Sequence, residues 1–483
     1  MTDTPTSITY SSVVSHDSVR IALLVAALND IDIQACDIQN AYLNAPCREK
    51  VYTIVGKEFG SDAGKVMLIK RALYGLRSSG ASFRSFLGEA LYNLGYIPSL
   101  ADLDVWLRKA VKPCGFAYYE YVLCYVDDVL SVSHDPQSTM KGIQQTFKLK
   151  GDKYRTPDSY LGAVVDTMMN ASGTRCWTQS SDRYISALIQ TVEDVLERKG
   201  NSLPNKCVTP FSSGYRPELN VSPELKVDGM QYFQELIGML RWACELGRLD
   251  ILLEVSLLSA HLALPREGHL QQALHIFGYL KCRPKRKLAF DPDHPQVDER
   301  RFKRYDWFDF YRDAKEAIPD NMPEPRGNVV TTHCFVDADL AGNVKTRRSQ
   351  TGILIFVNRA PILWHSKKQN TVESSTFGAE IVALKNAIEL VEGLRYKLRM
   401  FGIPVEGPTN IYCDNEAVYK NCLIPESTLK KKHHSIAYHR NREAVACGTV
   451  RIAKEDTKTN LSDVFTKVLT APRRNELFDK FMY

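Results

Sequence analysis

The chain has 483 residues and a formal net charge of +6, with 62 Lys and Arg against 56 Asp and Glu. At roughly 100 to 200 residues per domain, this length predicts two to four domains, and the near balance of charge excludes a histone-like polycation. Hydrophobic residues make up 44% and charged residues 24%, a composition typical of globular proteins that excludes disordered and collagen-like chains.

The sequence gives no sign of a membrane helix or a leader peptide. The longest apolar run, Ile21 to Leu28, is far shorter than the roughly 20 residues that a membrane helix needs. Met1 to His16 has neither a basic start nor an apolar stretch. The 12 cysteines include no Cys-x-x-Cys pair, which argues against a disulfide scaffold and a redox motif. We therefore expect an intracellular protein without a membrane partner.

From about Ile8 to Leu280, short β-rich runs alternate with helical stretches. Helices are expected at Phe83 to Leu94 and at Met230 to Leu246, where apolar residues recur at helical spacing. Between Lys281 and Asn328, prolines recur, charges of both signs crowd together and periodicity disappears. This segment is the predicted domain boundary.

An acidic pair interrupts the segment Tyr121 to Ser133, which reads YVLCYVDDVLSVS. Strand-forming runs flank Asp127 and Asp128, which predicts a β-hairpin with the pair at its turn. Adjacent carboxylates repel each other and are expected where a divalent cation compensates them, and Mg²⁺ prefers such oxygen ligands. Another carboxylate, Asp37, follows the run IDIQAC.

Beyond the boundary, the order of elements predicts a mixed sheet that carries helices. A strand is expected at Val329 to Val336, followed by a hairpin of Gly352 to Val357 and Ala360 to Trp364. A long amphipathic helix should run from Thr376 to Met400. The remaining elements are expected as strand, helix, helix, strand and helix at Asn410 to Cys413, Asn415 to Leu423, Ile436 to Ala446, Val450 to Ala453 and near Leu461.

Four carboxylates accompany these elements. Asp337 and Asp414 follow strands, Glu380 lies in the long helix, and Asp463 lies in the last helix. Carboxylates at adjacent strand ends and on covering helices can converge on one metal cluster. Such a cluster would support two-metal hydrolysis of a phosphodiester by an activated water.

Two of these assignments have competitors. Asp339 competes with Asp337, which we prefer because it follows the strand directly. Glu373 competes with Glu380, which we prefer because it lies within the helix.

The motifs CDIQNAYLNA, RALYGLRSSGASF, YVDD at 125–128 and YLG at 160–162 resemble, in order, those of the reverse transcriptase of Ty1/copia-type LTR retrotransposons. The second half, with HSKKQNTVESSTFGAE and KKHHSIAYHRNRE, resembles the RNase H domain that follows the polymerase in that family. The resemblance covers residues 7 to 469 and implies an α+β multidomain protein.

The family arrangement implies a right-hand polymerase palm with reduced fingers and a helical thumb or connection, then an RNase H-like mixed α/β domain. The corresponding boundaries are 1–165 for fingers and palm, 166–280 for thumb or connection, 281–328 for a linker and 329–483 for the RNase H-like domain. The start of the chain lacks the upstream fingers strands of relatives, so we expect truncated fingers.

The resemblance also implies roles for site residues. In the polymerase, Asp37 and Asp127 would bind metal, with Asp128 as a supporting acid. Asp337, Glu380, Asp414 and Asp463 would be the catalytic metal ligands of the RNase H domain. Each site would hold two Mg²⁺, with Mn²⁺ as a substitute. Substrate would contact Tyr42, Gly75, Tyr125 and Val126. Tyr42 would lie beneath the sugar and would clash with a ribose 2′ hydroxyl. The alternative is that Tyr42 is an aromatic residue of the core.

The sequence departs from the family pattern at three places. Gly80 replaces a common Pro, and Ser82-Phe83 replaces Ala-Trp, in the segment that frames the nascent base pair. No histidine lies between Gly448 and Asp463, so the mobile histidine of some RNases H has no counterpart. We expect reduced catalytic efficiency from these changes.

Two tracts rich in Lys, Arg and His are candidates for phosphate contacts with an RNA/DNA hybrid, which would give salt-dependent, sequence-independent affinity. The candidates are Lys281, Arg283, Lys285, Arg286, Lys287, Lys430, Lys431, Lys432, His433, His439 and Arg442. A zinc site of His433, His434, His439 and Cys447 fits no familiar ligand spacing, so packing or hybrid contacts are preferred there.

The predicted function is RNA-directed DNA synthesis with degradation of the RNA strand, on an RNA template, a DNA primer and deoxynucleoside triphosphates. The expected location is the cytoplasm, in a family-like particle, with access to the nucleus. Two alternatives stay open: a catalytically impaired remnant that only binds nucleic acid, and a nuclease alone.

Overall fold

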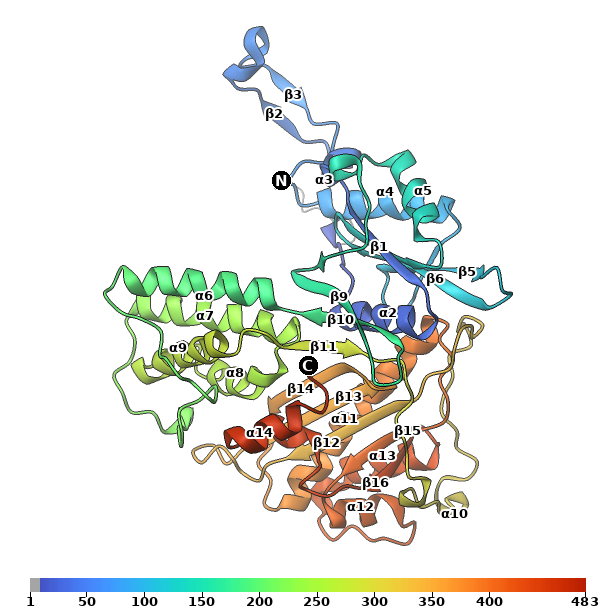
Figure 1. The fold of residues 1–483 in the computed structure, drawn as a ribbon, viewed down its shortest axis with the longest axis vertical. Helices are drawn as coiled ribbons and strands as arrows, with labels where there is room; N and C mark the ends of the chain where they lie inside the picture. Colours follow the sequence, from blue (N-terminus) through green and yellow to red (C-terminus); the bar gives the residue numbers. More distant parts are fainter. Residues whose placement is uncertain (1–8) are drawn as a thin grey trace. The chain divides into compact units, whose positions relative to one another are not determined.

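The computed structural model describes residues 9–483, and the chain forms two compact units (Figure 1). The first comprises Met1–Leu161 with Met400–Gly402, and the second comprises Gly162–Arg399 with Ile403–Tyr483. The expectations that concern Met1 to Ile8 lie outside the described residues. Across 9–483, the helices are all too short or too polar to cross a membrane.

A five-stranded antiparallel sheet of order β1-β7-β6-β5-β4 forms the centre of the first unit. Its strands are β1 (Asp32–Asp37), β4 (Ile97–Pro98), β5 (Val105–Val111), β6 (Ala117–Tyr125) and β7 (Asp128–Ser133), and β8 (Ser159–Tyr160) ends the unit. The helices are α2 (His16–Leu28), α3 (Ala41–Asn44), α4 (Ser79–Asn93) and α5 (Pro136–Thr146).

One face of this sheet is covered by α4 and α5. Phe83 and Leu87 of α4 and Ile143 of α5 share a core with Val122 and Val129 of the sheet. The predicted helix at 83–94 is confirmed, because α4 contains nearly all of it. The hairpin of β2 (Tyr52–Ile54) and β3 (Val66–Leu68) extends away from α3 and α4 as an arm (Figure 1).

The acidic hairpin forms, but its turn lies one residue earlier than predicted. Tyr125 of β6 pairs with Asp128 of β7, which leaves Val126 and Asp127 as a two-residue turn. Val126 adopts a left-handed backbone conformation (φ 55°), as primed hairpin turns require. On its other edge β7 pairs with β1, so Asp37 lies directly opposite Asp128.

The second unit begins with a helical part. Its helices are α6 (Asp182–Glu197), α7 (Val227–Glu245), α8 (Leu252–Ser259) and α9 (Glu267–Cys282), next to an antiparallel ladder of β9 (Ala163–Met169), β10 (Arg175–Ser180) and β11 (Lys287–Phe290). Phe233 and Leu240 of α7 are fully buried in the bundle core, and the predicted helix at 230–246 is confirmed.

The segment expected as a linker carries regular structure. Its first two residues complete α9, and Leu288, Ala289 and Phe290 form the buried end of β11. This three-residue apolar run is hidden in the sequence among five charged neighbours. A short helix, α10 (Phe308–Tyr311), follows further along.

The remainder of the second unit is a mixed sheet of order β14-β13-β12-β15-β16, with β15 and β16 parallel to β12. The predicted mixed α/β order is confirmed. The elements are β12 (Thr332–Ala338), β13 (Gln350–Val357), β14 (Ala360–Lys368), α11 (Thr376–Met400), β15 (Thr409–Cys413), α12 (Glu416–Leu423), α13 (Ser435–Ala446) and β16 (Val450–Lys454).

The C-terminal region differs from the prediction. The expected helix near Leu461 is a single 3₁₀ segment, η7 (Leu461–Phe465), and an α-helix that was not predicted, α14 (Ala471–Phe478), follows it. Leu477 and Phe478 of α14 pack in one core with Phe356 of β13 and Phe465.

Buried ion pairs connect α14 to the helical part. Arg474 of α14 lies 2.8 Å from Glu254 of α8, and both side chains are at most 4% exposed. Arg248 binds Asp250 with two bonds of 2.9 Å, and Tyr279 donates to the same carboxylate at 2.9 Å. Burial alone would raise the pKa of Asp250, but the Arg248 guanidinium reverses this and holds it well below its usual range. For Glu254, burial outweighs Arg474 and raises the pKa.

We expect Arg474→Met to lower the free energy of unfolding by about 3 kcal/mol or more, because it leaves the Glu254 carboxylate buried without its partner. The double variant Arg474→Met/Glu254→Gln should regain most of this loss, since several atoms of the pair already lack hydrogen-bond partners. Urea unfolding measures both. The exposed Arg300→Met is the control and should leave the midpoint unchanged; equal losses in Arg474→Met and the control would contradict the prediction.

Candidate active sites

The second unit gathers carboxylates at the carboxyl end of its parallel strands. Asp337 is the penultimate residue of β12 and Asp414 directly follows β15, so parallel pairing places them at the same edge of the sheet. Glu380 reaches this edge from the first turns of α11. One ligand atom from each of the three lies within 4.8 Å of the others.

Burial makes this carboxylate cluster electrostatically costly. Asp337 is 1% exposed and Glu380 is 5% exposed. Burial, followed by repulsion from Asp337 and Asp414, raises the pKa of Glu380 well above its usual range. Burial and Asp337 also raise the pKa of Asp414. The Oε2 atom of Glu380 is buried without a hydrogen-bond partner, so the cluster has both the ligand set and the unmet charge that suit a divalent cation.

Asp463 joins this cluster through a lysine. Lys467 Nζ lies 2.8 Å from Asp463 Oδ1 and 3.1 Å from Asp337 Oδ2, and Thr466 donates its hydroxyl to Asp337. Burial and Asp337 raise the pKa of Asp463 to about 6, although Lys467 opposes the shift.

Neither of the two competing carboxylates belongs to the group of Asp337, Glu380 and Asp414. Asp339 accepts the backbone N–H of Gln350 at 2.5 Å, and burial raises its pKa to about 6. Glu373 lies 3.5 Å from the ring of His434. The group within 4.8 Å therefore contains the preferred residues, Asp337 and Glu380.

The first unit brings Asp37, Asp127 and Asp128 to one end of its sheet. The backbone N–H of Ile38 donates to the Asp127 carbonyl at 2.9 Å, which fixes the turn beside β1. Burial, then Asp127 and Asp37, raise the pKa of Asp128 to about 6. Lys150 lies 3.0 Å from Asp37 and is itself exposed.

The carboxylates of these three aspartates are less tightly grouped than those of the second cluster. In the chain from 9 to 483, the groups with three ligand atoms all within 4.8 Å are Asp337-Glu380-Asp414 and Glu373-His433-His434. The first acidic site is thus a set of neighbouring carboxylates with a lysine among them. Its hollow, lined by Asp37, Asp128, Lys150 and Lys153, has a volume of about 400 Å³.

Aromatic residues lie near this first site. Tyr42 on α3 packs its ring 4.6 Å from that of Tyr74 and 6.2 Å from that of Phe83. A Cβ at Gly80 would lie 3.2 Å from Ser11 Cβ and 3.8 Å from the Tyr42 hydroxyl, so glycine relieves a tight approach to Ser11. Gly75 adopts φ 95° in the preceding loop, and Tyr125 and Val126 are half-buried at the hairpin turn.

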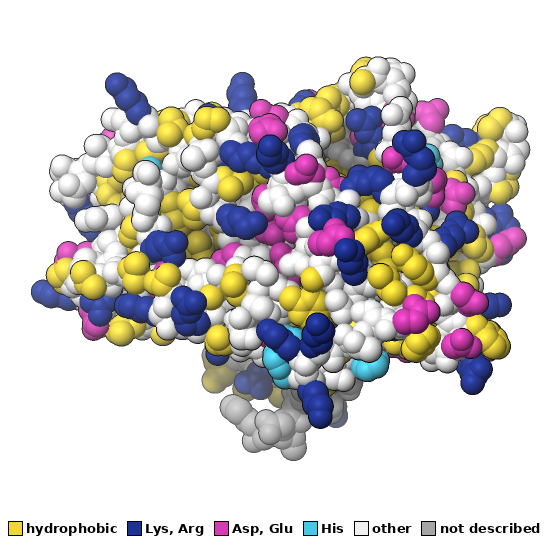
Figure 2. Space-filling view, turned by 90° about the horizontal axis from the view of Figure 1, so that it is seen from below, with side chains coloured by type: hydrophobic (Ala, Val, Ile, Leu, Met, Phe, Trp, Pro, Cys, Tyr) yellow, Lys and Arg dark blue, Asp and Glu magenta, His cyan; other side chains and the backbone are white. Residues whose placement is uncertain are grey.

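The predicted phosphate-binding residues fall into two groups. Lys285, Lys430, Lys432, His433 and His439 are exposed. The others have protein partners: Lys281 pairs with Glu193, Arg283 with Asn475, Arg286 with Asp479 and Lys431 with Ser374 and Ser375, and Lys287 lies in β11. On the face shown in Figure 2, Lys and Arg are interspersed with acidic side chains.

Arg442 requires a correction. Its side chain is buried and donates to the carbonyls of Asn421, Ile424 and Pro425. Its guanidinium also lies 4.7 Å from the ring centres of both Trp307 and Tyr438. The structure therefore gives Arg442 a packing role in place of the expected phosphate contact.

The cations of the two acidic sites were not expected from the sequence. Lys467 lies four residues after Asp463, a spacing typical of ion pairs, and the motif NLSDVFTK contains both. Lys150 has no such local signal, because it is 113 residues from Asp37 in the sequence.

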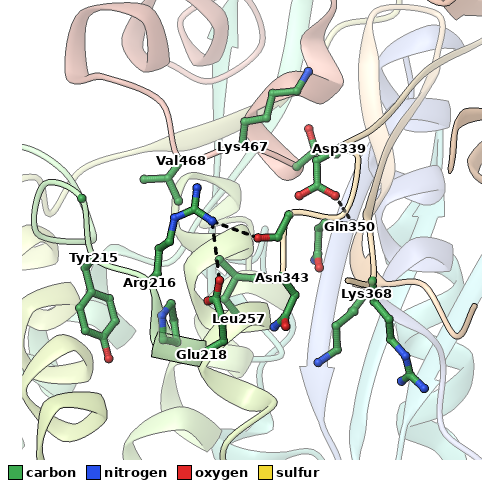
Figure 3. A pocket seen from close by; sticks show the side chains of 15 residues that line it. Tyr215, Arg216, Glu218, Leu257, Asp339, Asn343, Gln350, Lys368, Lys467 and Val468 are labelled. Carbon is green, nitrogen blue, oxygen red and sulfur yellow. Dashed lines mark hydrogen bonds and ion pairs between the residues drawn. The ribbon is translucent and has the colours of Figure 1, made fainter. Parts of the chain in front are cut away.

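A hollow of about 420 Å³ lies beside the second cluster, with Asp339, Thr466 and Lys467 in its wall (Figure 3). Arg216 reaches into it between Glu218, 3.7 Å away, and the Gly342 carbonyl, to which it donates at 3.2 Å (Figure 3). Arg348 and Lys368 add positive charge to the wall. The hollow is thus shaped by side chains of the helical part and of the mixed sheet.

The protein has two candidate sites for phosphodiester chemistry. One is the carboxylate hairpin of the first unit, and the other is the carboxylate cluster on the mixed sheet of the second unit. Residues 5–204 match the family described as reverse transcriptase (RNA-dependent DNA polymerase). Over 96% of its length the chain is 27% identical to the retrovirus-related Pol polyprotein from transposon RE1 of Arabidopsis thaliana, and over 95% it is 25% identical to that from transposon TNT 1-94 of Nicotiana tabacum. The chain is thus similar over nearly its whole length to retrovirus-related Pol polyproteins of transposons, and its residues 5–204 are similar to the reverse transcriptase family.

The chain spans 28% and 31% of the length of these two relatives. Among solved structures, RNase H1 from Halobacterium salinarum aligns at 18% identity and a TM-score of 0.22, covering 32% of this chain and 98% of that one. A foamy viral protease-reverse transcriptase in complex with double-stranded DNA aligns at 12% identity and a TM-score of 0.19, covering 90% of this chain and 61% of that one.

The titration of Asp463 gives a prediction for stability. Its pKa is about 6 in the folded protein against an ordinary 3.8, so the unfolded chain ionises first and stability falls as the pH rises through this window. We expect Asp463→Asn, without divalent ions, to raise the free energy of unfolding by about 1 to 3 kcal/mol at neutral pH and to change it little at about pH 4.

Urea unfolding at the two pH values measures this difference. Asp313→Asn, at an exposed position, should show no such pH dependence. A lower stability of Asp463→Asn at neutral pH would mean that the Lys467 pair outweighs the burial and repulsion of this carboxylate.

Proposed function

We propose that the chain is an RNA-directed DNA polymerase joined to an RNase H, which copies RNA into DNA and hydrolyses the RNA of the hybrid. The observation that carries this proposal is the convergence of Asp337, Glu380 and Asp414 within 4.8 Å at one sheet edge, in a chain whose residues 5–204 match the reverse transcriptase family. In this proposal the sheet of the first unit is the palm, the β2–β3 arm belongs to the fingers, and α6 to α9 form the thumb or connection.

The nuclease site would hold divalent metal, with Mg²⁺ as the proposed ion because all of its ligand atoms are carboxylate oxygens. Asp337, Glu380 and Asp414 would hold it, and Asp463 would join them when Lys467 moves aside. When bound, the metal lowers the pKa of a water and neutralises charge on the phosphate. Glu380 brings to this site a buried oxygen without a partner, which favours cation binding over an empty state.

In the polymerase site, Asp37 and Asp127 would hold metal and Asp128 would support them. Lys150 is paired with Asp37, and it would have to release this carboxylate before the site is occupied. Because its ammonium is on an exposed, flexible side chain, the exchange requires only a rotamer change. Deoxynucleoside triphosphate would lie against Tyr42, Gly75, Tyr125 and Val126.

The template-primer and the hybrid would be bound mainly through phosphates. The exposed cations Lys285, Lys430 and Lys432 suit this role. Arg348 and Lys368, in the hollow beside the nuclease carboxylates, are positioned for a phosphate close to the scissile bond. The alternatives are a chain that only binds nucleic acid and a nuclease without polymerase activity.

We expect Asp127→Asn to abolish DNA synthesis and spare RNA cleavage, and Asp414→Asn to do the reverse, each by about 100-fold or more, since metal-ion stabilisation of the transition state is worth several kcal/mol. The measurement is primer extension on a labelled RNA template with Mg²⁺, with DNA synthesis and RNA cleavage read in the same tube.

Asp313→Asn serves as the control and should retain both activities. Synthesis that survives Asp127→Asn would overturn the polymerase assignment, and cleavage that survives Asp414→Asn would overturn the nuclease assignment. Cleavage without synthesis by the unmodified chain would favour the nuclease alternative, and binding without either activity would favour the remnant.

We expect Tyr42→Val to raise incorporation of ribonucleotides relative to deoxyribonucleotides by about 10-fold or more, because the smaller side chain leaves room for a 2′ hydroxyl. Single-nucleotide extension with each triphosphate measures the ratio of kcat/KM. Tyr92→Val removes an exposed tyrosine from α4 and should leave the ratio unchanged. An unchanged ratio in Tyr42→Val would place this ring in the core of the unit and away from the sugar.

A further inference from the structure

A second group of potential metal ligands lies outside both carboxylate sites. It consists of Glu373, which precedes α11, and of His433 and His434, which lie in the 3₁₀ segment η6 (Lys432–His434) before α13. One ligand atom from each side chain lies within 4.8 Å of the other two. The group shares no residue with the cluster of Asp337, Glu380 and Asp414.

The distance between its two buried members matches a coordination polyhedron better than a hydrogen bond. His434 Nε2 and Glu373 Oε2 are 3.5 Å apart, which is too long for an effective hydrogen bond. Ligands about 2.05 Å from a tetrahedral zinc ion are about 3.3 Å from one another, so 3.5 Å is close to the edge of such a tetrahedron.

Both facing atoms are buried and lack other partners. Glu373 is 7% exposed and His434 is 3% exposed. Neither Glu373 Oε2 nor His434 Nε2 has a hydrogen-bond partner. Such buried polar atoms are costly unless they are satisfied, and an ion between them would satisfy both. His433 is exposed, so the group keeps one side open to solvent.

The surroundings of the pair support a ligand role. Thr371 donates its hydroxyl to Glu373 Oε1 at 2.8 Å, which orients the carboxylate and leaves Oε2 for an ion, as outer partners of metal ligands do. A Cβ at residue 378 would lie 2.8 Å from Glu373 Oε2 and 2.8 Å from His434 Nε2. Only glycine at this position lets the two ligand atoms approach each other.

The neighbouring Lys431 is bound to side chains outside the group. Lys431 points its ammonium to the hydroxyls of Ser374 and Ser375, at 3.3 and 3.0 Å.

We propose that Glu373, His433 and His434 form a zinc-binding site, with a water as the fourth ligand. Two imidazoles and one carboxylate are a ligand set that zinc accepts, whereas Mg²⁺ prefers oxygen ligands throughout. The ion would fasten the segment that leads into α11 to the segment that leads into α13. Because α11 carries Glu380, this fastening sets the position of the helix start next to the carboxylate cluster.

The test is a zinc titration of the full chain, stripped of metal and kept in excess Mg²⁺ so that the carboxylate sites are occupied. Isothermal calorimetry gives the affinity, and Co²⁺ as a spectroscopic substitute reports tetrahedral nitrogen and oxygen ligands by its visible absorption. We expect one site, weakened at least about 10-fold in each of Glu373→Gln, His433→Asn and His434→Asn.

Two further variants make the result decisive. His439→Asn removes an exposed histidine of α13 outside the group and should bind zinc like the unmodified chain. Gly378→Ala retains all three ligands but separates them, and should also weaken zinc at least about 10-fold. If a buried variant fails to fold, His433→Asn still decides, because its side chain is exposed.

Absence of a zinc site in the presence of Mg²⁺ would overturn the proposal. So would a site whose affinity is indifferent to His433→Asn and Gly378→Ala, since zinc would then be bound elsewhere, for example by cysteines. A loss of affinity in these two variants with His439→Asn unaffected supports the proposal.

Discussion

Repulsion between carboxylates is the constraint on which the rest of this structure depends. Each unit holds several acidic side chains at one end of a sheet, and burial raises the pKa of Asp128 and Asp463 to about 6. Both sets are tolerated because a lysine is placed among them, Lys150 in the first and Lys467 in the second. In the protein without bound metal, the two lysines thus neutralise the negative charge that a bound metal cation would otherwise neutralise.

The surrounding framework explains how such unfavourable groups are held together. Asp337 and Asp414 meet because β12 and β15 are parallel neighbours whose ladder of paired residues ends just before the acids. Asp37 and Asp128 meet through antiparallel pairing of β1 with β7. In both units, the backbone hydrogen bonds and the buried apolar side chains on the same strands supply the stability that the carboxylates remove.

How much of this could be predicted depended on the range of the interactions. The acidic hairpin and the helix from Thr376 to Met400 follow from local patterns: the helix forms as predicted, and the hairpin forms with its turn one residue earlier. The pairing of Lys150 with Asp37 spans 113 residues, so no local pattern reveals it. Lys467 pairs with Asp337 over 130 residues, and only its spacing from Asp463 is a local signal. Arg442 was a candidate for phosphate contact because it lies in a basic tract, whereas the carbonyls that it binds and the Trp307 ring come from other segments.

The buried Arg474–Glu254 pair has a consequence for how such a chain can be inherited. Recombination preserves a folded segment when the point of exchange lies where few interactions cross it. Here an exchange between α9 and β12 would separate Glu254 from Arg474, two charged side chains that have almost no access to water. A helical part received from one ancestor and a mixed sheet from another would each carry half of a buried pair. The two parts of the second unit are therefore expected to descend together, as a single heritable block.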